Sequence, residues 1–91
     1  MPVYKHKCLL ECANAFGMKV SDFAEFMGYS RQAVYQANEG ITKLDPRRLA
    51  LAQFKLDAVN EKMLAEERAK ADENFKRREK LIDELMERLG R

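Results

Sequence analysis

The distribution of glycine and proline most constrains what this chain can fold into. Glycine occurs at positions 17, 28 and 40, and each stands where a segment with helical apolar spacing ends. After Pro46 neither residue interrupts the chain until Gly90, which leaves roughly 44 residues of potential helix, on the order of 65 Å long. The pattern predicts short helices followed by one long helix, and therefore an all-α fold.

Length and composition favour a binding or assembly role over catalysis. A chain of 91 residues forms one domain at most and buries only about 60 to 65 percent of its unfolded surface, so a deep catalytic cleft is not expected. The sole histidine, His6, lies in the N-terminal arm, and no carboxylate pair is fixed in a concave setting. We therefore predict that the protein is not an enzyme and has no cofactor or small-molecule ligand.

The charge is nearly balanced in both halves of the chain. Residues 1–45 carry five basic and five acidic side chains, and residues 46–91 carry twelve and ten. Neither half is a polycation, so any nucleic-acid binding must come from individually placed residues. No apolar run approaches the roughly 20 residues of a membrane span, and the apolar stretch within residues 1–10 is too short for a secretory signal to be expected. The sequence predicts a cytoplasmic protein without membrane contact.

The two cysteines, Cys8 and Cys12, are four residues apart on the apolar face of the first predicted helix. We predict that they are small core side chains. A zinc site would need further ligands, and apart from His6 the chain has no other histidine or cysteine, so a metal site is expected only if two chains share it. A disulfide between the two is disfavoured because residues four apart on a helix are poorly placed for bridging.

Three segments with helical apolar spacing are separated by the glycines. Residues 4–16 predict a first helix, which Gly17 would end in the left-handed conformation. Ser21 is the predicted N-cap of a second helix, which ends at Gly28. Ser30 is the predicted N-cap of a third helix, which runs to about residue 38.

The second and third predicted helices match the helix-turn-helix pattern, in which two short helices flank a glycine turn and the second lies in the DNA major groove. Ala24 is small where the helices would cross closely, and Gly28 supplies the turn. The side chains predicted to face inward are Phe23, Ala24, Met27, Val34 and Ala37, with Tyr29 covering the turn. Those facing outward are Arg31, Gln32, Tyr35 and Gln36, and arginine and glutamine are types that read base edges.

Residues 20–39, VSDFAEFMGYSRQAVYQANE, resemble the helix-turn-helix of phage Cro and lambda-type repressors. The resemblance rests on Ala24, Gly28, Val34 and Ala37. It implies that Arg31, Gln32, Tyr35 and Gln36 contact bases. The family often has a glutamine that grips phosphate at the start of the first helix of the pair, and this chain has Val20 there. Contacts with the DNA backbone are therefore predicted for Lys19, Ser21, Ser30 and Lys43, together with backbone amides.

The long C-terminal segment is predicted to begin at Asp45 as N-cap, with Pro46 at the first helical position. Its apolar residues recur in steps of three and four, which is typical of a coiled-coil or bundle seam. Charged residues then dominate from 65 to 80, and an apolar patch returns at residues 81–89. No turn residue would let this patch fold back on the head, so a second copy of the chain is the simplest partner. The predicted dimer contacts are Leu56, Val59, Met63, Phe75, Ile82, Leu85 and Leu89.

These features together predict a homodimeric, repressor-like transcription regulator that binds double-stranded DNA at an inverted-repeat operator. Residues 1–45 would form the helix-turn-helix head and residues 46–91 a long helical dimerisation segment. Two alternatives remain open. One is a phage packaging component similar to a small terminase subunit, or a plasmid partition component. The other is a protein-interaction adaptor with a coiled-coil tail, which the near-neutral head would suit.

Overall fold

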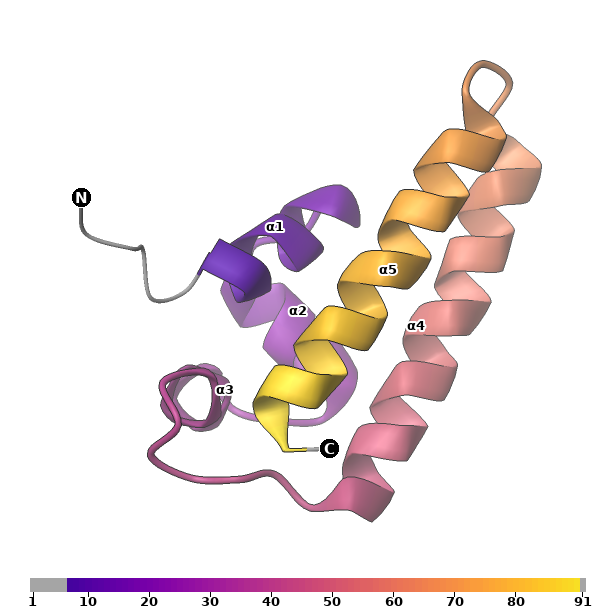
Figure 1. Ribbon diagram of the computed structural model, residues 1–91. Coiled ribbons are helices and arrows are strands. Elements are labelled where there is room, and N and C mark those ends of the chain that lie inside the picture. Colours follow the sequence, from indigo (N-terminus) through magenta and orange to yellow (C-terminus); the bar gives the residue numbers. More distant parts are fainter. Residues whose placement is uncertain (1–6, 91) are drawn as a thin grey trace.

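The computed structural model describes residues 7–90, which form five helices. Their arrangement is shown in Figure 1. They are α1 (Lys7–Ala15), α2 (Val20–Met27), α3 (Arg31–Asn38), α4 (Pro46–Glu66) and α5 (Ala71–Leu89). No strand occurs among these described residues, and the predicted all-α class is confirmed. The two long helices, α4 and α5, run antiparallel as a hairpin, and α1, α2 and α3 pack against it.

Two of the predicted helix caps are present. The Ser30 hydroxyl oxygen accepts a hydrogen bond from the Ala33 amide at 3.1 Å and caps α3. The Asp45 carboxylate accepts one from the Arg47 amide at 3.1 Å and caps α4, with Pro46 at the start of the helix. In both cases a side-chain oxygen satisfies an amide that has no partner within the helix. Both helices therefore begin where the local sequence predicts.

The predicted cap at Ser21 is wrong. The helix α2 begins one residue earlier, and Lys19 occupies the N-cap position without a side-chain hydrogen bond. Lys19 has an extended backbone, and its carbonyl already accepts the Phe23 amide at 2.9 Å. Helical hydrogen bonding is therefore established before Ser21, which lies exposed in the first turn.

The predicted uninterrupted helix from residue 46 to residue 90 is also wrong. The chain leaves α4 after Glu66, turns through residues 67–70, and returns as α5 (Figure 1). Lys70 adopts the left-handed conformation with φ 56°, the single non-glycine residue between 7 and 90 to do so. That conformation costs a non-glycine residue roughly 1–2 kcal/mol, so other contacts must offset it.

A polar network closes the hairpin beside this turn. The buried Arg78 guanidinium donates to the Glu67 carboxylate, and its Nε donates to the Asn60 side chain at 2.5 Å. The Asn60 amide group in turn donates to the Phe75 carbonyl at 3.1 Å, and Asn74 donates to Glu67. Hydrogen bonds from Arg78 and Asn74 lower the pKa of the Glu67 carboxyl. The network therefore joins the end of α4 and the following turn to α5.

The apolar patch of α5 is buried within its own chain. Its buried apolar side chains are Leu81, Ile82, Leu85, Met86 and Leu89, and α5 contacts α1, α3 and α4. Of the residues predicted to form the dimer contact, Leu56, Ile82, Leu85 and Leu89 are fully buried in one chain, and Val59, Met63 and Phe75 are partly buried. The patch therefore needs no second chain, because the turn at residues 67–70 brings α5 back onto the head.

The cysteines take the core positions predicted for them. Cys12 is fully buried in α1, and Cys8 is partly buried one turn earlier. Burial raises the pKa of the Cys12 thiol to about 12, so the thiol remains protonated at neutral pH. His6 lies outside the described residues. Between residues 7 and 90, no three histidine, cysteine, aspartate or glutamate side chains are grouped so that they could hold a metal ion.

Candidate nucleic-acid interface

The helices α2 and α3 are joined by a tight turn. Gly28 has φ 91°, the left-handed conformation that favours glycine, and the Tyr29 amide donates to the Ala24 carbonyl at 2.9 Å. Ala24 is fully buried, as the close approach of the two helices requires. The other side chains predicted to face inward are also buried: Phe23, Met27, Val34 and Ala37. The prediction for the inner face of residues 20–39 is confirmed.

The first turns of α4 hold the α2–α3 turn in place. The Arg48 guanidinium donates to the Gly28 carbonyl at 2.6 Å and lies 4.5 Å from the centre of the Tyr29 ring. Lys55, two turns further along α4, donates to the Phe26 carbonyl at 3.5 Å. Carbonyl oxygens at the end of α2 thus accept hydrogen bonds from cationic side chains, which the helix dipole favours. The Arg48 guanidinium also makes a cation–π interaction with Tyr29. Arg48 is not predicted from the sequence, because no local pattern links it to a turn 20 residues earlier.

The end of α3 is held by α5. The Arg88 Nε donates to the Asn38 side-chain oxygen at 2.8 Å, and Asn38 is buried. Next to this contact, the Leu44 amide donates to the Leu89 carbonyl at 3.1 Å, which fixes the loop between α3 and α4. The C-terminal helix therefore positions the helix that would enter a DNA groove. No local pattern in the sequence predicts this role of α5.

The outward face of α3 carries the four residues predicted to contact bases. Arg31 and Gln32 are exposed in its first turn, whereas Tyr35 and Gln36, one turn later, are partly buried. The Tyr35 ring packs against the core. Residues three and four apart share one helix face, so all four lie together, but the most accessible groups are those at the N-terminal end of α3.

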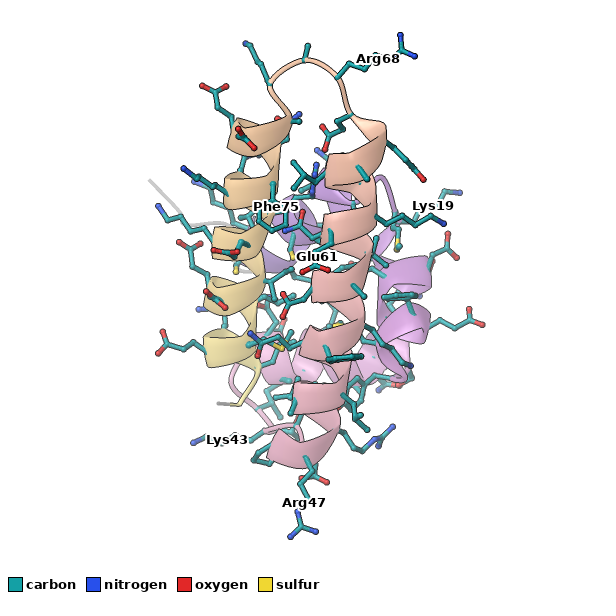
Figure 2. All side chains as sticks on the ribbon, turned by 90° about the vertical axis from the view of Figure 1, so that its right-hand side faces the viewer. Lys19, Lys43, Arg47, Glu61, Arg68 and Phe75 are labelled. Atoms are coloured by element: carbon teal, nitrogen blue, oxygen red, sulfur yellow. The ribbon has the colours of Figure 1, made fainter. Side chains whose placement is uncertain are left out.

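The residues predicted to contact the DNA backbone are all exposed but do not form one cluster. Lys19 and Ser21 lie at the start of α2, Ser30 at the start of α3, and Lys43 in the loop before α4. Figure 2 shows Lys19 and Lys43 projecting away from each other at different parts of the molecule. The hydroxyl of Ser30 is already engaged as the cap of α3. Phosphate contacts from this set would therefore be spread along a surface.

An acidic groove lies between α4 and α5. It is lined in part by Asp57, Glu61, Glu79 and Asp83. Burial of its carboxyl group raises the pKa of Asp57, and the neighbouring charges of Asp83, Glu79 and Glu61 raise it further. Such a surface repels phosphate. The residues that line the groove belong to α4 and α5, and in Figure 1 α3 lies on the opposite side of α5 from α4.

Comparisons with protein-family models, with characterised proteins and with solved structures find no match to this chain. Within residues 7–90, none of the helices is both long and apolar enough to cross a lipid bilayer.

Proposed function

We propose that this protein is a cytoplasmic, sequence-specific DNA-binding regulator of transcription, repressor-like in its action, that places α3 in the major groove. The exposed first turn of α3 carries this proposal. It presents Arg31 and Gln32 to solvent, while the opposite side of the α2–α3 pair is anchored by Ala24 and Val34 in the core. A short helix with one buried face and one polar, exposed N-terminal face has the form of a recognition helix.

Each exposed group has a defined role in the proposed complex. Arg31 would make a bidentate contact with guanine, and Gln32 would pair with the edge of adenine. Tyr35 and Gln36 would contact the same groove from the second turn. Lys19, Ser21, Ser30 and Lys43 would contact phosphates and set the register of the protein on the duplex. Because the net charge is small, affinity would come from these contacts, and its dependence on salt would be set by the lysines that contact phosphate.

Recognition by a single short helix covers few base pairs, so we propose that two copies act together on an inverted repeat. Half-sites would lie about one helical turn, or a multiple of it, apart. Binding of both heads to one duplex can raise the affinity by about 10² to 10⁴ when the geometry permits. The proposed unit of function is therefore a homodimer.

The experiment that tests this function is selection from a random duplex library with the 91-residue chain, followed by a salt titration on the enriched site. Enrichment of an inverted repeat supports the regulator, whereas failure to enrich any sequence contradicts it and favours the protein-interaction adaptor. A ring-sized assembly on DNA would instead favour a packaging component. The matched control is Arg68→Ala, because Arg68 is an exposed arginine in the turn between α4 and α5, far from α3 (Figure 2).

A further inference from the structure

The outward face of α4 carries an apolar stripe that the chain leaves uncovered. Leu51 is 65 % exposed and Phe54 is 72 % exposed. With Arg47, Ala58 and Glu61 they follow one another in steps of four, three, four and three residues, so all five lie on one side of the helix. Figure 2 looks onto α4, with Arg47 near its start and Glu61 farther along it. We refer to these five residues as the α4 stripe.

Three side chains that flank the α4 stripe make hydrogen bonds within the chain. On one flank, Arg48 and Lys55 donate to carbonyls of Gly28 and Phe26. On the other flank, Gln53 donates to the Asp83 carboxylate on α5 at 3.2 Å. The side chains of Arg48, Lys55 and Gln53 are therefore directed toward α2 and α5. Leu51 and Phe54 remain as an exposed apolar ridge, with Arg47 and Glu61 at its two ends.

The two charges of the stripe are placed symmetrically. Arg47 lies seven residues before Phe54 and Glu61 lies seven residues after it, which is about 10 Å in each direction along a helix. A two-fold axis near Phe54 would therefore place Arg47 of one copy beside Glu61 of the other, at both ends of the contact. A parallel arrangement would place arginine beside arginine and glutamate beside glutamate, which is repulsive.

We propose that the α4 stripe is the surface through which two copies of this chain associate, with their α4 helices antiparallel and Phe54 near the two-fold axis. Phe54 and Leu51 of each copy pack against Phe54 and Ala58 of the other. The contact spans only about four helical turns on each side, which is small for a stable dimer, so association is reversible in the micromolar range. The inference rests on the proposed function and deepens it, because binding to an inverted repeat requires two copies of the chain to associate.

Sedimentation of the 91-residue chain without DNA, over a concentration range from about 1 to 500 µM, tests whether two copies associate through the α4 stripe. We expect a monomer–dimer equilibrium, which Phe54→Glu weakens roughly tenfold or more because it places two carboxylates at the axis. The matched control is Ile41→Glu, since Ile41 is 66 % exposed but lies in the loop between α3 and α4. Circular dichroism establishes that both variants remain folded. A wild-type protein that stays monomeric throughout, or a control that weakens association as much as Phe54→Glu, overturns the proposal.

Charge reversal tests the antiparallel arrangement. Arg47→Glu and Glu61→Arg should each weaken the dimer by about threefold to tenfold, since like charges then meet at both ends. The double variant should restore wild-type association, and a mixture of the two single variants should form a heterodimer. If neither single variant weakens association, or if the double variant does not restore it, the antiparallel arrangement is wrong. None of these measurements uses DNA, so their failure is separate from failure of α3 to bind a duplex.

Discussion

Arg88, near the end of α5, donates a hydrogen bond of 2.8 Å to Asn38, the last residue of α3, across 50 positions of the sequence. Asn38 is buried, so its side chain depends on partners within the protein. The contact makes the C-terminal helix part of the structure that holds the proposed recognition helix. A change at Arg88 should therefore affect both stability and the proposed binding of α3 to DNA.

Arg88→Ala should lower the free energy of unfolding by about 1–3 kcal/mol, because it leaves the buried Asn38 oxygen without this donor. Urea denaturation followed by circular dichroism measures the loss. The control is Arg77→Ala, which removes an exposed arginine from the same helix. Equal stabilities of the two variants would show that the Asn38 contact contributes nothing beyond a surface charge.

The hydrogen bonds to Glu67 predict a specific dependence of stability on pH. The folded pKa of Glu67 lies below its usual value of about 4.3, so its stabilising contribution is fully present above that value and is lost as pH falls through the folded pKa. Thermal melting between about pH 6 and 2 should show wild-type stability falling more steeply than that of Glu67→Gln. The control Glu66→Gln, next to it at the exposed end of α4, should retain the wild-type slope. Parallel melting profiles for the wild type and Glu67→Gln would contradict this account.

Ala24→Leu should overpack the crossing of α2 and α3, because Ala24 has no exposed surface. We expect a loss of about 1–3 kcal/mol in the free energy of unfolding, measured by chemical denaturation. The matched substitution Ala50→Leu, at an exposed position of α4, should cost little. If Ala24→Leu unfolds like the wild type, the helices are not closely packed at this residue.

Arg31→Ala should weaken binding to the selected duplex by about 1–3 kcal/mol and relax the preference at one base position. Arg31 is exposed at the start of α3, so the substitution should leave the melting temperature unchanged. Fluorescence anisotropy on specific and random duplexes distinguishes a base contact of Arg31 from a phosphate contact. An equal loss on both duplexes would assign Arg31 to a phosphate contact, whereas Arg68→Ala should alter neither.

Truncation after residue 66 should abolish cooperative folding. It removes α5, which contributes five buried apolar side chains, among them Ile82 and Leu85, and the Arg88 contact with α3. The remaining helices would then expose the apolar faces that α5 covers. Circular dichroism during thermal melting should show a broad, non-cooperative transition. A truncated chain that still melts cooperatively would mean that residues 7–66 form a core without α5.

The sequence by itself determined the features that depend on neighbours within about one helical turn. Ser30 and Asp45 cap helices because their side-chain oxygens reach amides two or three residues ahead. Gly28 forms the turn because its backbone tolerates a positive φ. Ala24 and Val34 are buried because helical periodicity places them on the apolar face. The exposed positions of Arg31 and Gln32 follow from the same periodicity.

Only the tertiary structure decided the path of the chain after Glu66. Lys70 takes a left-handed conformation that no local signal predicts, because the hairpin buries the apolar side of α5 and satisfies Arg78 and Glu67 together. The same folding back brings Arg88 to Asn38. These contacts join residues 11 to 50 positions apart, and their free energy exists only once the helices have packed, so no pattern along the sequence could predict them.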